Sequence, residues 1–274
     1  MKTRLFILSG ILVLSTSFSA NAQEAKQGYS AENLRIAIPF NNCSTDTILE
    51  AGPGFSAWIE VDDKVILFDT GSDYKVLLEN LTKMKLDYNR VTDIFISHNH
   101  WDHIYGMPGA AGVKGFQVNT FIPKSSVDGI IQQMPRLKYS AIDSFRELYP
   151  GIWTTGEMSS VFQNTTIAEQ AMIIDTKAGL VVITGCSHPG IETIVKLVNE
   201  KFPRREIKLL VGGFHLERKT LEEIEQISDF LKQSGIKAIA PSHCTGQGAI
   251  DYFRKDWREN FIQLFLGDNL LLKI

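Results

Sequence analysis

The stretch Ile96–Gly106, with the sequence ISHNHWDHIYG, places three of the six histidines of the chain and one aspartate close together. The residues just before it are apolar and partly β-branched, which is typical of a strand. His98 and His100 lie two positions apart, so an extended backbone would point both imidazole rings to one side. Asp102 and His103 follow after the chain has turned, and this spacing predicts a second metal ion beside the first.

The other three histidines stand in similar places. Each follows an apolar strand and a short turn rich in Gly, Ser or Pro, and none falls on a predicted helix; they are His188, His215 and His243. Strand ends on one rim of a sheet are where proteins of the α/β class gather their binding groups. Neutral imidazole and carboxylate suit Zn²⁺, Mn²⁺ or Fe. We therefore expect two divalent metal ions, with zinc as the first expectation and manganese or iron as alternatives.

The N-terminal segment has the pattern of a secretory signal peptide. Lys2 and Arg4 precede an apolar run over Leu5–Leu14, and a small-residue site follows at Ala20–Ala22. These are the basic, apolar and cleavage regions of such a peptide. The apolar run is too short for a spanning helix, which needs roughly 20 apolar residues. The pattern predicts a signal peptide over residues 1–22, a periplasmic or secreted protein, and no stable membrane anchoring.

The rest of the chain, residues 23–274, is long enough for a single domain with its own core. The whole chain has a formal net charge of −3, and cleavage would remove the basic Lys2 and Arg4. This sign gives no reason to expect nucleic acid as a partner. We expect a small-molecule substrate and leave the oligomeric state open. Three cysteines do not make a disulfide framework.

Apolar periodicity predicts strands and helices that alternate in part and form hairpins in part. Strands are expected over 34–40, 55–61, 64–68, 91–96, 171–175, 180–184, 207–211 and 236–240, with a closing hairpin of 261–266 and 269–274. Helices are expected over 74–86, 191–202, 221–234 and 249–259. This order predicts mixed sheets with helices on the outside. The segment 125–169 has the weakest pattern, and it is expected either to cover the site as a long connection or to divide between core helix and surface.

The histidine cluster carries a family resemblance. The pattern His98-x-His100-x-Asp102-His103, preceded by the turn Phe68–Gly71, resembles the signature of the metallo-β-lactamase superfamily. The resemblance implies a four-layer αββα sandwich of two mixed β-sheets flanked by helices. It implies that the first two histidines hold one metal, and that the aspartate and third histidine hold the other. It also places Asp69 beneath the site, where it would orient a ligand.

The chain departs from the usual pattern of that superfamily at the later ligands. No histidine lies between His103 and His188, and the usual Thr-Gly-Asp, whose aspartate bridges the ions, is Thr184–Cys186 here. Three phrases, GCSHPG at 185–190, GGFHL at 212–216 and SHCTG at 242–246, resemble the subgroup of dihydropterin/ribosyl-aminobenzene phosphate synthases. By this resemblance His188 completes the first metal site and His243 the second. His215 would bind an oxyanion or move protons.

Cys186 has three interpretations. It replaces the bridging aspartate as a thiolate ligand, sits beside the site as a small residue, or pairs with Cys244 in an oxidising compartment. Cys43 is expected to be a buried small hydrophobe. Trp101, inside the motif, is expected to line the pocket.

Three functions remain as hypotheses, and the sequence does not specify the substrate. The first is an exported binuclear-zinc hydrolase, in which a metal-bound hydroxide attacks an ester-, lactone-, amide- or phosphoester-type substrate, with Asp102 and His215 as catalytic residues. The second is a dihydropterin-type transferase that forms a C–N bond, against which the signal peptide argues because pterin intermediates are cytosolic. The third is a non-catalytic metal- or ligand-binding protein.

Overall fold

The computed structural model describes residues 3–6, 31 and 33–273. The predicted signal peptide, residues 1–22, lies outside the described residues except for the strand β1 (Thr3–Phe6), which pairs in parallel with β16 (Asn269–Lys273). No helix among the described residues is long and apolar enough to cross a membrane.

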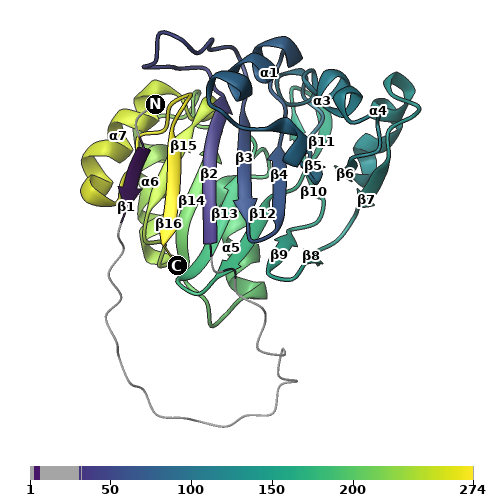
Figure 1. Cartoon of the computed structure of the whole chain (residues 1–274). Helices are drawn as coiled ribbons and strands as arrows, with labels where there is room; N and C mark the ends of the chain where they lie inside the picture. Colours follow the sequence, from purple (N-terminus) through teal and green to yellow (C-terminus); the bar gives the residue numbers. More distant parts are fainter. Residues whose placement is uncertain (1–2, 7–30, 32, 274) are drawn as a thin grey trace.

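Two large mixed sheets form the centre of the described chain (Figure 1). The larger sheet has the order β1-β16-β2-β3-β4-β5-β6-β7, and the smaller has the order β15-β14-β13-β12-β9-β8. The further strands of the larger sheet are β2 (Asn33–Phe40), β3 (Ser56–Val61), β4 (Lys64–Phe68), β5 (Asp93–Phe95), β6 (Asn119–Pro123) and β7 (Tyr139–Ile142). Those of the smaller sheet are β8 (Arg146–Tyr149), β9 (Ile152–Thr154), β12 (Met172–Thr176), β13 (Gly179–Thr184), β14 (Ile207–Gly213) and β15 (Ile239–Ser242). A separate hairpin consists of β10 (Met158–Phe162) and β11 (Thr165–Glu169).

Helices cover the outer face of each sheet. The helices are α1 (Tyr74–Lys83), α2 (Trp101–Ile104), α3 (Met107–Val113), α4 (Val127–Gln133), α5 (Ile191–Lys201), α6 (Leu221–Gln233) and α7 (Gln247–Trp257). Short 3₁₀ turns lie at η1 (Tyr88–Arg90), η2 (Lys124–Ser126), η3 (His243–Thr245) and η4 (Arg258–Asn260). Figure 1 shows α1, α3 and α4 on one side of the sheets and α6 and α7 on the other.

Three apolar clusters correspond to the interfaces between these layers. One joins the two sheets through residues such as Phe68, Phe95 and Ile183. A second packs the larger sheet against α1, α3 and α4, and a third packs the smaller sheet against α5, α6 and α7. Burial of apolar area stabilises such layers by roughly 25 cal/mol per Å². The arrangement is the predicted four-layer αββα sandwich, so the expected fold class is confirmed.

Parallel strands bring the functional loops to one rim. β4, β5 and β6 run parallel in the larger sheet, and β13, β14 and β15 run parallel in the smaller one. Their carboxyl ends therefore lie together, where α/β proteins bind ligands. A capping box of Thr220 and Glu223 begins α6. The hairpins β3–β4 and β12–β13 are also formed as predicted.

The predicted closing hairpin is wrong, because residues 261–266 form no strand beside β16. This segment crosses from one sheet to the other. Its backbone makes single hydrogen bonds to neighbouring segments instead of a continuous strand pairing. Ile262 N donates to Ile239 O at 2.8 Å, and Leu266 N donates to Cys43 O at 2.9 Å. Cys43 itself is exposed, so the prediction that it is buried is also wrong.

The segment 125–169 is more regular than predicted. It contains all of α4 and all of β7 to β11. Its strands are short, and β10 alternates between half-buried and exposed positions, so its apolar pattern is weak. Part of it nevertheless covers the rim of the sheets. This agrees with the first of the two alternatives for the segment, a long connection that covers the site.

Candidate metal centre

Six predicted ligands come together from both sheets. His98 and His100 follow β5 in the larger sheet, and His188 follows β13 in the smaller one. Their ring nitrogens converge: His100 Nδ1 lies 3.1 Å from His98 Nε2 and 3.1 Å from His188 Nε2. These three residues form one group whose ligand atoms lie within 4.8 Å of one another.

A second group lies beside the first. It consists of Asp102, His103 and His243, whose ligand atoms also lie within 4.8 Å of one another. His103 Nε2 is 3.2 Å from His243 Nε2, and Asp102 Oδ2 is 3.3 Å from His243 Nε2. His103 lies on the short helix α2, and His243 opens the 3₁₀ turn η3, two elements that the sequence did not predict.

Asp69 fixes the second group from below. It is fully buried after β4 and accepts hydrogen bonds from Ser97 N at 2.7 Å and Ser97 Oγ at 2.6 Å. Its Oδ2 is also 2.6 Å from His103 Nδ1. A proton on Nδ1 leaves Nε2 of His103 with its lone pair toward the second group, as a metal ligand requires.

The donor set fits divalent metal ions. Ring nitrogens that face each other at 3.1–3.2 Å cannot all be protonated without repulsion, whereas a cation between them would be attracted to every lone pair. Burial, followed by the charges of neighbouring histidines, lowers the pKa of His188 to about 3 and that of His98 well below its ordinary value. Neutral histidine is the ligand form. The chain therefore offers two adjacent ligand groups of a kind that suits zinc, manganese or iron.

The charges around the second group are set by the two aspartates. Burial alone would raise the pKa of Asp102, but its hydrogen bond and charge interactions with His243 and His103 outweigh this and lower it. Burial would lower the pKa of His103, but the charge and hydrogen bond of Asp69 raise it to about 9. A permanently ionised Asp102 adds negative charge to this group, which favours a cation there.

Cys186 lies between the two groups and is a free thiol. It is only 3% exposed, and its Sγ is 3.2 Å from His103 Nε2. The prediction from sequence left its role open, and the structure places it with ligands of both groups.

His215 lies at the edge of the first group. Its ring centroid is 4.4 Å from that of His188, and its buried Nδ1 has no hydrogen-bond partner among the described residues. A hydrogen bond with Cys244 raises its pKa, against the effect of burial. His215 therefore lies beside the first group without belonging to either group of three.

Three contacts of this centre escaped the sequence analysis. Glu169 accepts hydrogen bonds from the backbone N–H groups of Cys186, Ser187 and His188, Asn42 Oδ1 is 2.6 Å from His243 Nδ1, and Phe162 packs on three histidine rings. None of them belongs to a motif or repeats a spacing. The one signal was that the segment 125–169, which contains Phe162 and Glu169, was expected to cover the site in one of its two interpretations.

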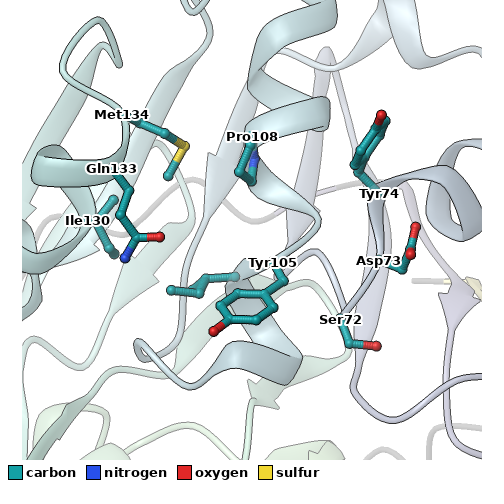
Figure 2. A pocket seen from close by; sticks show the side chains of 9 residues that line it. Ser72, Asp73, Tyr74, Tyr105, Pro108, Ile130, Gln133 and Met134 are labelled. Carbon is teal, nitrogen blue, oxygen red and sulfur yellow. The ribbon is translucent and has the colours of Figure 1, made fainter.

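A cavity of about 320 Å³ lies beside the metal motif. It is lined by Ser72, Asp73, Tyr74, Ile104, Tyr105, Pro108, Ile130, Gln133 and Met134. Figure 2 shows the Tyr105 ring between the α4 side chains and Ser72. Ile104 and Tyr105 directly follow the ligand His103. Trp101, predicted to line the pocket, is 48% exposed and packs against Tyr105 with ring centroids 6.0 Å apart, outside the set that lines this cavity.

Similarity to known proteins extends over most of the chain. The chain is 27% identical over 259 residues to the 7,8-dihydropterin-6-methyl-4-(beta-D-ribofuranosyl)-aminobenzene-5'-phosphate synthase of Methanocaldococcus jannaschii, covering 78% of this chain and 88% of that protein. It is 30% identical over 228 residues to an uncharacterized protein of the same organism, covering 72% and 85%. The similarity to the synthase contradicts the first functional hypothesis, an exported binuclear-zinc hydrolase, because the relative is a biosynthetic enzyme that joins two molecules.

Solved structures agree with the fold. One described as a metal-dependent hydrolase of the beta-lactamase superfamily superposes with a TM-score of 0.72 and 26% identity, covering 88% of this chain and all of that one. A sequence profile of the Metallo-beta-lactamase superfamily matches residues 49–118, which include the whole histidine motif. Membership in this superfamily of metal-binding enzymes supports the interpretation that the chain is an enzyme, and not the third hypothesis, a non-catalytic binding protein. The chain belongs to the metallo-β-lactamase superfamily.

Proposed function

We propose that this protein is a metal-dependent synthase that joins a dihydropterin-like ring to an aromatic amine through a C–N bond. The observation that carries the proposal is the similarity to the M. jannaschii synthase, which spans 88% of that enzyme. Its reaction class matches the subgroup that the phrases around His188, His215 and His243 resemble.

Two divalent ions are part of the proposal. His98, His100 and His188 would hold one, and Asp102, His103 and His243 the other, with zinc as the first candidate. When bound, such ions act as Lewis acids that stabilise negative charge on an oxygen of the substrate.

The reaction needs a nucleophile, a leaving group and a proton acceptor. In the proposed step the aromatic amine attacks a methylene carbon next to the pterin ring. The N–C bond forms as the C–O bond of a phosphate or diphosphate ester breaks, and the leaving oxygen takes the electron pair. The amine loses one proton, which His215 Nδ1 would accept; the absence of a hydrogen-bond partner for this buried nitrogen among the described residues supports that role.

The cavity beside the metal motif suits a planar ring. Tyr105 and Tyr74 contribute aromatic faces to it, and Ile104, Pro108 and Met134 contribute apolar surface. Offset stacking on an aromatic side chain is worth about 0.5–1.5 kcal/mol beyond the area buried. We propose that the pterin-like ring lies against Tyr105, one turn away from the metal ligands on α2.

The compartment remains a separate prediction. The signal peptide pattern at residues 1–22 predicts export, whereas a pterin substrate is expected in the cytosol. N-terminal sequencing of the protein isolated from its own cells decides this, since cleavage would give a chain that begins near Gln23.

The proposed reaction is tested with purified, zinc-loaded protein. The substrates are the diphosphate ester of 6-hydroxymethyl-7,8-dihydropterin and 4-(β-D-ribofuranosyl)aminobenzene 5'-phosphate. We expect the condensed product by mass spectrometry, in equal amount to the diphosphate released. Release of diphosphate with no condensed product, or no turnover by protein of full metal content, would contradict the proposal.

Two variants test the assigned roles in the same assay. His215→Ala should lower kcat by about 10²–10⁴-fold if His215 takes the proton. Tyr105→Ala should raise KM for the pterin while kcat changes little, and Tyr139→Ala, an exposed tyrosine on β7, is the matched control.

A further inference from the structure

Cys186 is within reach of both ligand groups. Its Sγ and the ligand atoms of His98 and His103 all lie within 4.8 Å of one another. The same sulfur forms a second such set with His188 and His215 and a third with His243 and Cys244. No other cysteine or carboxylate among the described residues shares a set with ligands of both groups.

The backbone around Cys186 is held rigidly by one buried carboxylate. Glu169, at the end of β11, is 0% exposed. One of its oxygens accepts hydrogen bonds from Cys186 N at 2.9 Å and Ser187 N at 2.7 Å, and the other accepts one from His188 N at 2.7 Å. Ser187 has a left-handed φ of 63°, which needs such support.

The backbone that precedes Cys186 is also closely packed. Gly185, which precedes Cys186, lies against the Ser97 hydroxyl, and an added Cβ would be 2.1 Å from Ser97 Oγ. Ser97 in turn donates to Asp69. The backbone around Cys186 is thus packed against the β5 loop on one side and bonded to Glu169 on the other, and its Sγ lies 3.2 Å from His103 Nε2.

From this geometry we infer that the Cys186 thiolate is the ligand shared by the two metal ions, and that Glu169 is the residue that positions it. Binding breaks the S–H bond, forms bonds from sulfur to metal and releases the proton to solvent, without any change of oxidation state. Thiolate is a strong ligand for Zn²⁺ and a poor one for Mn²⁺, so the centre should prefer zinc. The inference rests on the metal binding of the proposed function but not on its reaction, so a failed synthase assay leaves it intact.

Cobalt substitution tests this directly. Metal-free full-length protein is titrated with Co²⁺, whose bond to a thiolate gives a sulfur-to-cobalt charge-transfer band in the near ultraviolet. We expect two equivalents to bind and the band to be present. Cys186→Ser should abolish the band, and Cys244→Ser and Cys43→Ser should retain it.

A second variant separates ligation from folding. Cys186→Asp supplies a carboxylate in place of the thiolate, and it should bind two Co²⁺ without the band. A wild-type protein with two bound Co²⁺ and no band would overturn the inference, as would a band that survives in Cys186→Ser and disappears in Cys244→Ser. A disulfide between Cys186 and Cys244 in the isolated protein, seen as a single free thiol after denaturation, would also overturn it.

The positioning role of Glu169 is tested separately, through Co²⁺ affinity and the charge-transfer band of a Glu169 variant. Glu169→Gln keeps the size of the side chain but places an amide nitrogen against a backbone N–H, so the loop must shift. We expect Co²⁺ affinity to fall by about 10–100-fold and the band to shift or weaken. Glu157→Gln is the control, because Glu157 accepts hydrogen bonds from Ser125 in the same region without touching Cys186. Unchanged affinity and spectrum in Glu169→Gln would remove Glu169 from the site.

Discussion

Asp69 shows how much of this centre depends on single side chains. Two carboxylate oxygens take three donors, two from Ser97 and one from His103, in a residue with a left-handed φ of 51°. A conformation of this kind costs about 1–3 kcal/mol. The hydrogen bonds offset that cost and hold the His103 ring in one orientation.

Replacement of Asp69 should therefore act on one metal ion more than on the other. In Asp69→Asn the amide can no longer accept from both Ser97 and His103, so the second metal should bind about 10–100-fold more weakly while the first is retained. Metal content after dialysis, measured by mass spectrometry, checks this. Asp73→Asn is the matched control, because Asn also caps a helix N-terminus and Asp73 caps α1 on the surface. Equal loss of both metals would contradict the assignment.

Glu169 makes stability depend on pH in the metal-free protein. Burial raises its pKa to about 7 from an ordinary 4.5, against the three backbone hydrogen bonds and the charge of His103. The folded state then holds an extra proton between these two values, so stability falls as pH rises from 4.5 to 7. The difference amounts to roughly 3 kcal/mol at 1.36 kcal/mol per pKa unit.

Denaturant unfolding of metal-free wild type and of Glu169→Gln across this pH range tests whether stability falls as pH rises. Other titrating groups are common to both proteins, so the wild type should lose stability relative to the variant as pH rises. A constant difference between the two curves would show that Glu169 does not titrate in this range.

Some site residues were visible in the sequence and others were not, for a physical reason. His98 to His103 are close in sequence, and each distant histidine follows a strand, so local patterns predicted that they meet. Glu169 bonds to backbone atoms 17 to 19 residues along the chain, and Asn42 to a ring 201 residues away, and such contacts exist only in the folded chain. The left-handed backbone of Asp69 likewise has no local cause, since aspartate does not require it.

At the scale of elements, the β10–β11 hairpin is the part that closes the rim. Phe162, the last residue of β10, lies over the rings of His100, His188 and His215, with centroids 5.6, 4.9 and 5.0 Å apart. The hairpin pairs only with itself among the described strands. It therefore covers the first ligand group with an aromatic ring held by a small element.

Phe162→Ala should open this cover without unfolding the protein. We expect a chelator to remove bound metal faster in stopped-flow measurements, because solvent reaches the first ligand group. Val161→Ala is the control, since Val161 is 75% exposed on the same hairpin. Identical rates in the wild type and Phe162→Ala would show that the hairpin does not limit metal release.

Prediction of strands succeeded where both faces of the strand are buried and failed where one face is exposed. The central strands β3, β4 and β13 are nearly continuous apolar runs, and α6 has its capping box, so they were predicted within a few residues. β7, β8 and β10 lie at sheet edges or outside the sheets and carry polar residues on exposed faces. Residues 261–266 are apolar because they cross between the sheets, which the same pattern cannot distinguish from a strand.

At the scale of the whole molecule, each metal would join the two sheets. Both ligand groups combine residues after β5 with a histidine after β13 or β15. Because binding requires the folded arrangement, the free energy of binding adds to stability. At a free zinc concentration 100 times Kd, one site contributes about 2.7 kcal/mol.

Thermal unfolding with and without Zn²⁺ measures this contribution. For a domain of this size each kcal/mol raises Tm by about 2–4 °C, so saturating zinc should give a clear upward shift. His243→Ala, which removes one ligand of the second group, should show a smaller shift. Equal Tm values for metal-free and zinc-treated wild type would contradict metal binding at this rim.

The division of ligands between the sheets also orders events during synthesis of the chain. The ribosome releases His98 to His103 when less than half of the protein exists, His188 much later, and His243 close to the C-terminus. The pair of sites in the nascent chain therefore stays incomplete until His243 has been synthesised. The second metal can therefore bind only after His243 has been made, and a truncation before His243 should leave a product with one metal at most.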